Sequence, residues 1–162
     1  MKKKIFLYVL IVFLLFAKQG SSLENKIILK INDKIITTFD VKQEKKYLIV
    51  LNPKLNKIDQ NKLNVLATES IIKEKIKEIE LIKYYQIEKV LDDPNLKKII
   101  KNLHQTVGFQ KEKQFKDYLE NQSLKFSSIK RKLAMERLWN NVIFEKFNNR
   151  VVINEIEIKN NL

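Results

Sequence analysis

The stretch IILKINDKIITTFD, residues 27–40, holds the local signals around which the rest of the chain can be arranged. Two short β-branched runs, 27–31 and 35–37, flank the polar pair Asn32 and Asp33. Two such runs around a two-residue turn signal predict a small β-hairpin. The chain is therefore expected to open with two short antiparallel strands.

The same stretch also contains the start of a helix. Thr37 or Thr38 offers a side-chain oxygen for a helix N-cap, and Asp40 follows in the first turn, where the helix dipole favours a negative charge. The helix is expected to run to about Leu51. Pro53 ends it, because the residue before a proline is disfavoured in the α-region.

Beyond this stretch, apolar residues recur at helical spacing. A long helix is expected from about Asp59, followed by an extended linker at residues 87–90. Lysines and glutamates occupy its opposite face, which predicts a solvated surface. The expected buried stripe consists of Val65, Ile72, Ile76 and Ile79, widened by Leu66, Ile71, Ile82 and Tyr85.

Three more helices follow. Residues 92–94 combine a capping aspartate with a proline in the first turn, and Gly108 stops that helix in the left-handed conformation. A short helix is expected around residues 115–119. Ser127 or Ser128 is expected to cap a fifth helix of about 20 residues.

The composition agrees with a mainly α fold, in which a short N-terminal β-hairpin precedes about five helices. Only two glycines and two prolines occur in 162 residues. An all-β sandwich or barrel needs a turn residue about every 8 to 12 positions, so that class is nearly excluded. Loops of spaced glycines that cradle phosphates are excluded as well.

The N-terminus has the three-part pattern of a secretory signal peptide. Residues 1–4 are basic, residues 5–17 form an unbroken apolar run, and small residues precede a cleavage site between Ser22 and Leu23. Thirteen apolar residues rise only about 20 Å as a helix, short of a bilayer core of about 30 Å. We therefore expect residues 1–22 to direct export to the periplasm; an uncleaved, tilted anchor is the alternative.

The exported domain, residues 23–162, is expected to be soluble and basic. Four of the lysines lie in the signal peptide, so the net charge falls from +13 for the chain to +9. Lysines far outnumber the three arginines and alternate with glutamates, unlike the arginine-rich, aromatic surfaces that bind nucleic acid. We expect no nucleic-acid partner. The lack of cysteine excludes disulfides, thiolate metal sites and a cysteine nucleophile.

No pattern of catalytic residues emerges. His104, the only histidine, is expected at the edge of a helix. Asp92 and Asp93 suit a helix cap better than a metal pair, and Glu155 and Glu157 suit a helix start. We therefore expect no enzyme activity, no metal and no cofactor.

The motifs and their order resemble a known family. The segment INDKIITTFDV, residues 31–41, is similar to the opening motif of the N-terminal domain of SurA-type periplasmic chaperones. Further similar segments occur in the family's order and together cover essentially all of residues 23–162. These segments are 65–86, 108–119, 124–126, 129–152 and 154–158.

The resemblance implies the helical peptide-binding fold of SurA and trigger factor, and an ATP-independent chaperone for unfolded outer-membrane or envelope proteins. In that family a parvulin-type peptidyl-prolyl isomerase domain follows. Its glycine-rich, histidine-containing core is not found in this sequence, so isomerase activity is not implied. Two alternatives stay open: a non-enzymatic adaptor that forms a homodimer and docks one folded partner, and a fragment of a longer isomerase.

A chaperone without ATP needs a partly exposed apolar or aromatic groove within a charged exterior. Most aromatic residues lie at helical spacing and are expected in the core. Phe109, Tyr118 and Phe126 fall at helix ends or connections. These three are our predicted client-binding residues, with packing in the core as the alternative.

Overall fold

A computed structural model of the protein describes residues 25–148. That part of the chain is mainly helical, as expected, with one two-stranded antiparallel hairpin and two short 3-10 helices. The elements are β1 (Ile27–Ile31), β2 (Lys34–Thr37), α2 (Thr38–Leu51), η1 (Pro53–Lys57), α3 (Gln60–Leu81), η2 (Ile87–Val90), α4 (Pro94–Thr106), α5 (Glu112–Asn121) and α6 (Phe126–Phe147).

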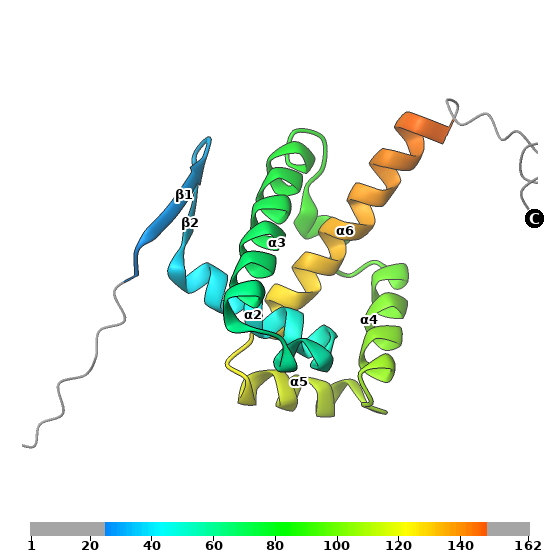
Figure 1. The fold of residues 1–162 in the computed structure, drawn as a ribbon. Helices are drawn as coiled ribbons and strands as arrows, with labels where there is room; N and C mark the ends of the chain where they lie inside the picture. Colours follow the sequence, from blue (N-terminus) through cyan, green and yellow to red (C-terminus); the bar gives the residue numbers. More distant parts are fainter. Residues whose placement is uncertain (1–24, 149–162) are drawn as a thin grey trace, which may run out of the picture.

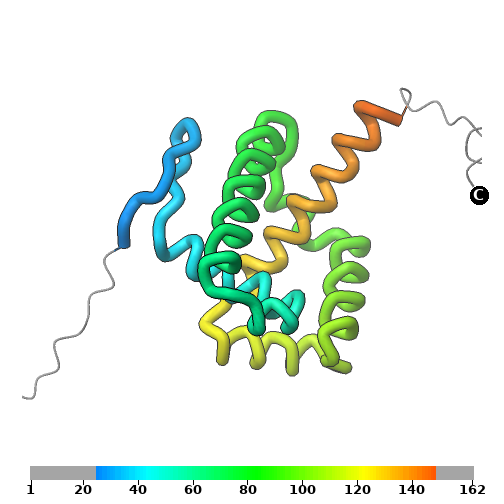
Figure 2. The backbone as a smooth tube through the Cα atoms, in the orientation of Figure 1, coloured from blue at the N-terminus to red at the C-terminus, as the bar shows by residue number. Residues whose placement is uncertain are grey.

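Helix α6 is the central element of the fold (Figure 1). It packs against both α3 and α4, while α2 packs against α3 and α5 lies against the beginning of α6. The tube in Figure 2 shows that the hairpin and the last turns of α6 lie at the periphery. The C-terminal half of α6 therefore has fewer neighbours than the N-terminal half.

The hairpin and the first helix form as the local sequence predicts. Ile31 pairs with Lys34 across a two-residue turn, in which Asn32 has a φ of +53°, a left-handed value that asparagine tolerates. The N-cap of α2 is Thr37. Its N–H donates to Oδ2 of Asp40 over 2.8 Å, and its hydroxyl accepts from the Asp40 N–H, which completes a capping box.

Helices α4 and α5 end in the same backbone motif with different residues. Gly108 follows α4 with a φ of +96°, and the next N–H, of Phe109, donates to the carbonyl of His104 over 2.7 Å. This confirms Gly108 as the residue that stops α4. Ser123 occupies the corresponding position after α5, with a φ of +57° that favours glycine.

The core consists of three apolar clusters. One joins α3, η2, α4 and α6; the second joins α2, α5 and the start of α6; the third joins the hairpin, α2 and α3. Their buried members are Leu81, Ile87, Leu96, Ile100, Ala134, Met135 and Leu138 in the first, Val50, Phe115, Leu119, Leu124 and Ile129 in the second, and Ile36, Val41, Ala67 and Ile71 in the third.

The stripe expected to be buried on α3 is wrong in several positions. Val65 is 56% exposed and Ile76 46% exposed, and Leu66 and Ile82 are exposed as well. Because the buried face of α3 includes a charged residue, the pattern of apolar residues alone predicts the wrong face of the helix. The residues of α3 that are buried are Leu63, Ala67, Ile71, Glu78 and Leu81.

Two connections also differ from expectation. Residues 87–90 form the 3-10 helix η2 rather than an extended linker, because Ile87 is buried in the first core cluster. Neither Ser127 nor Ser128 caps α6, which begins at Phe126 with Lys125 as N-cap and no side-chain cap. Because Phe126 packs into the second cluster, the helix starts earlier than the cap signal indicates.

Candidate functional site

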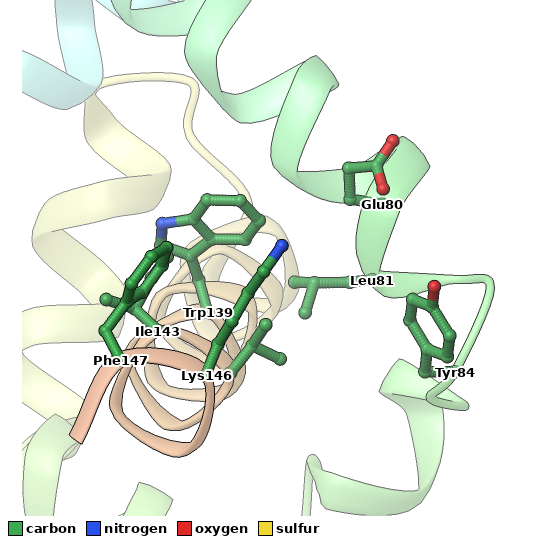
Figure 3. Close-up of a pocket in the computed structure, with 8 residues that line it drawn as sticks. Glu80, Leu81, Tyr84, Trp139, Ile143, Lys146 and Phe147 are labelled. Atoms are coloured by element: carbon green, nitrogen blue, oxygen red, sulfur yellow. The ribbon is translucent and has the colours of Figure 1, made fainter. Parts of the chain in front are cut away.

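An open apolar groove of about 450 Å³ lies between the end of α3 and the C-terminal half of α6 (Figure 3). Among residues 25–148, the side chains that line it come from two segments. They are Glu80, Leu81 and Tyr84 from α3 and the turn after it, and Trp139, Val142, Ile143, Lys146 and Phe147 from α6. We refer to this site as the α3–α6 groove.

The floor of the α3–α6 groove belongs to the core. Leu81 is 1% exposed, and Trp139 and Val142 pack against the same core cluster. The walls reach solvent, because Tyr84 is 76% exposed and Phe147 40% exposed. A firm apolar floor with exposed aromatic walls suits an apolar side chain of another polypeptide segment.

Two opposite charges border the α3–α6 groove. Glu80 forms an ion pair of 2.6 Å with Lys83, at the end of α3. The ammonium of Lys146 lies 5.8 Å from the centre of the Phe147 ring. Beside the groove, Phe144 is 65% exposed on the same turn of α6. The arrangement offers apolar contact and charge attraction.

The three predicted client-binding residues lie in a different place. Phe109, Tyr118 and Phe126 are each half-buried and pack with Phe115 in the second core cluster. The rings of Phe109 and Tyr118 are 5.0 Å apart, and those of Phe115 and Phe126 are 6.5 Å apart. We refer to these four residues as the aromatic cluster. From Phe126 to Trp139, α6 rises about 20 Å, so the two sites are separate.

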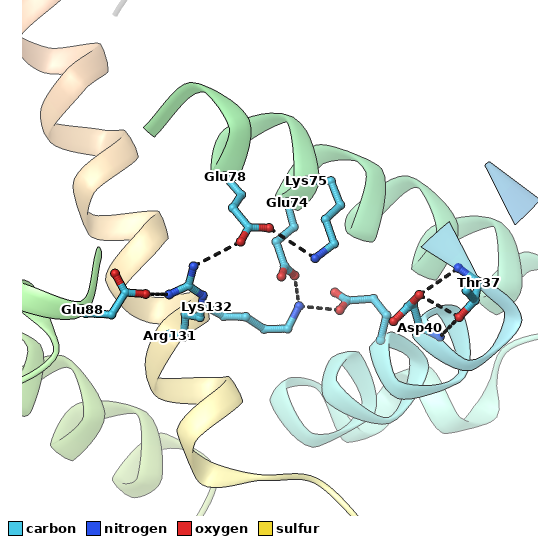
Figure 4. A network of polar contacts seen from close by, with 9 residues as sticks. Thr37, Asp40, Glu74, Lys75, Glu78, Glu88, Arg131 and Lys132 are labelled. Atoms are coloured by element: carbon cyan, nitrogen blue, oxygen red, sulfur yellow. Dashed lines mark hydrogen bonds and ion pairs between the residues drawn. The ribbon is translucent and has the colours of Figure 1, made fainter. Parts of the chain in front are cut away.

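A charged layer joins α2, α3 and the N-terminal half of α6. Lys132 of α6 donates to Glu44 of α2 over 2.6 Å and pairs with Glu74 of α3 (Figure 4). Ser70 donates to the other oxygen of Glu44 over 2.7 Å. Burial, with the nearby charges of Glu44 and Glu136, raises the pKa of Tyr47 above its ordinary value. Glu44 is 2% exposed, so this layer is structural.

Arg131 extends the charged layer toward η2. It pairs with Glu88 and lies 3.1 Å from Glu78, which also pairs with Lys75 (Figure 4). Burial by itself would raise the pKa of Glu78, but the charge of Lys75 and the hydrogen bonds from Arg131 and Lys75 outweigh it, and the pKa is lowered. The carboxylates here are held ionised by partners, which suits stability rather than acid–base catalysis.

The single histidine corrects one expectation. His104 is 4% exposed, not at a helix edge, and its Nδ1 lies 2.7 Å from the carbonyl oxygen of Phe109. It therefore secures the end of α4. Asp93 is the N-cap of α4, as expected, and Asp92 pairs with Lys130. Within residues 25–148, no three histidine or acidic residues gather in a way that could hold a metal ion.

Several predictions lie outside the described residues. These are the signal peptide, its cleavage site between Ser22 and Leu23, and the helix start with Glu155 and Glu157. In the part of the chain that the structure describes, no helix combines the length and apolar character needed to cross a bilayer. Comparisons with protein-family models, curated proteins and solved structures found no match to this chain.

The α3–α6 groove was missed from the sequence, although a signal for it exists. Apolar residues in the last ten positions of α6 occupy more of the helix circumference than one packed face needs. They are Leu138, Trp139, Val142, Ile143, Phe144 and Phe147. Such an excess on a peripheral helix end indicates an apolar surface in contact with solvent.

Proposed function

We propose that this chain is an ATP-independent chaperone of the periplasm that holds unfolded outer-membrane or envelope proteins, and that client segments bind in the α3–α6 groove. The observation that carries the proposal is the firm apolar floor of this groove between exposed aromatic walls. Such a surface binds apolar side chains of many sequences, because apolar contact has no directional requirement.

Three further features support this function. The order of motifs resembles the N-terminal domain of SurA-type chaperones, the N-terminus has a signal-peptide pattern, and the net charge of +9 on residues 23–162 keeps an apolar-surfaced protein soluble. Weak contacts over a small groove also allow release without nucleotide hydrolysis.

The test uses residues 23–162, which contain every described residue. An unfolded outer-membrane β-barrel protein is diluted from urea, and its aggregation is followed by light scattering without nucleotide. The chain should suppress aggregation at a near-stoichiometric ratio. Replacing Ile143 and Phe147 by Asp should weaken suppression at least about tenfold, since each buried apolar side chain contributes about 1.5–3 kcal/mol and 1.4 kcal/mol is a factor of ten.

Two control variants make the test specific. Val65→Asp changes an apolar residue of α3 that is 56% exposed and does not line the groove, so suppression should not change. Tyr118→Ser tests whether the aromatic cluster takes clients instead. Helical circular dichroism must be preserved in each variant. A folded sample that suppresses nothing and forms a stable homodimer would overturn the proposal in favour of an adaptor with one dedicated partner.

A further inference from the structure

The chain leaves the described fold at the α3–α6 groove itself. Phe147, the last residue of α6, lines the groove, and Ile143 and Trp139 line it one and two turns earlier (Figure 3). Residues 149–162 then follow. Any segment directly after α6 is thus tethered within reach of the groove, at a high effective concentration.

The sequence of this segment includes apolar side chains, which are what would fill the apolar groove. Asn149 and Arg150 are polar, and asparagine tolerates the backbone conformations of a reverse turn. They are followed by the apolar run Val151, Val152 and Ile153. A chain that reverses after α6 therefore brings three consecutive apolar residues toward an apolar surface.

The lengths agree as well. From Phe147 back to Trp139, α6 rises about 12 Å over eight residues. Four extended residues span about 13 Å, which matches this length of α6. An extended run that begins at Val151 can therefore lie along the groove. A longer linker is not needed.

Charge supplies a second match. Of the three lysines in α6, Lys130 and Lys132 pair with carboxylates. Lys146, at the groove, has no carboxylate partner among residues 25–148 and places its ammonium over Phe147. Glu155 and Glu157 follow the apolar run after Asn154.

We propose that the segment of residues 151–157 of this same chain occupies the α3–α6 groove and competes there with client segments. The competing role rests on the proposed chaperone function; the docking itself does not. A tethered competitor lowers the apparent affinity for clients by the fraction of time for which it fills the groove. It also keeps an apolar surface covered when no client is present.

The test uses Trp139, the only tryptophan of the chain, which lines the groove and reports its occupancy by fluorescence. The variant replaces Val152 and Ile153 by Asp, because neighbouring residues of an extended chain point to opposite sides. The matched control replaces Asn160 and Asn161 by Asp, which adds the same charge farther along the segment. Both are made in residues 23–162.

In the Val152/Ile153 variant we expect Trp139 emission to shift to longer wavelength and acrylamide quenching to increase. The dye ANS should bind about tenfold more tightly if the segment fills the groove nine-tenths of the time. The control variant should behave as the unchanged chain. Unchanged emission and unchanged ANS affinity would overturn the proposal. A Trp139 signal that varies with protein concentration would also overturn it, because another copy would then supply the segment.

These outcomes separate the two proposals. If emission shifts but no variant affects aggregation of the β-barrel protein, the segment docks and the chaperone function fails. If emission is unchanged while substitution of Ile143 and Phe147 abolishes suppression, the function stands and the docked segment does not.

Discussion

Each half of α6 contains an isoleucine followed three positions later by a lysine. The two pairs are fourteen positions apart, and their surroundings are opposite. Ile129 and Lys132 lie in the first half, and Ile143 and Lys146 in the second. Fourteen residues are close to four helical turns, so the two pairs point in nearly the same direction. Ile129 is nevertheless 2% exposed and Ile143 38% exposed.

The difference arises from what packs against each half. The first half is enclosed by the second core cluster and by the charged layer of α2 and α3. The second half extends toward the periphery (Figure 2), and there it lines the open α3–α6 groove. One helix thus combines a structural half with a candidate binding half, and equal substitutions in the two halves should separate stability from binding.

The largest effect is expected for the isoleucines. Ile129→Ala should lower the free energy of unfolding by about 3 to 4 kcal/mol, because it leaves a cavity beside buried aromatic rings. Ile143→Ala should cost less than about 1 kcal/mol, since its side chain already contacts water. Urea unfolding followed by circular dichroism measures both. Equal losses at the two positions would show that the second half is packed in solution.

A smaller effect is expected for the lysines. Lys132→Met leaves Glu44 buried with Ser70 as its remaining partner, and should cost about 2 kcal/mol. The cost stays below that of a fully buried pair, because the side chain of Lys132 is 16% exposed. Lys146→Met should leave the urea midpoint unchanged and weaken binding of acidic clients at low salt. A Lys132 variant as stable as the unchanged chain would show that the charged layer contributes little.

Much of the fold could be predicted because its signals are local. Asn32 with its flanking strands, the capping pair of Thr37 and Asp40, and Gly108 each act within a few residues, and the structure has them where expected. The errors in the predicted fold occur where tertiary contacts, rather than the local sequence, determine the structure. Charged Glu78 lies on the buried face of α3, and Phe126 starts α6 early because of its packing.

The candidate site was less predictable for the same reason. For an aromatic residue at a helix connection, such as Phe109, the sequence leaves open a client-facing surface or the core, and the structure packs it into the aromatic cluster. The groove depends on where α6 extends beyond its neighbours, which no local pattern specifies. In the sequence, only the surplus of apolar residues around Phe144 indicates the α3–α6 groove. The client-binding role of Phe109, Tyr118 and Phe126 stays a prediction.

The smallest effect concerns pH, and it too separates the two halves of α6. In the first half, Arg131 pairs with Glu78 and Glu88, and Lys130 pairs with Asp92; the pKa of each of these carboxyl groups is lowered. The hydrogen bond from Lys130 lowers the pKa of Asp92 below its ordinary 3.8, and the charge of Lys75, with hydrogen bonds from Arg131 and Lys75, outweighs burial and lowers that of Glu78 below 4.5. A carboxyl group with a lowered folded-state pKa contributes stability above its unfolded pKa, and this is lost as the pH falls through the folded value.

We therefore expect the urea midpoint to be constant from pH 7 to about 5.5 and to fall as the pH decreases from about 4.5 to 3. Arg131→Met removes one of the two partners of Glu78 and should make this decrease shallower, while lowering the midpoint at pH 7. Lys146→Met should leave the decrease unchanged, because no carboxylate of the described residues pairs with Lys146. If the Arg131 and Lys146 variants have identical pH profiles, the charged contacts of the first half do not stabilise the fold, and the contrast between the halves reduces to apolar packing alone.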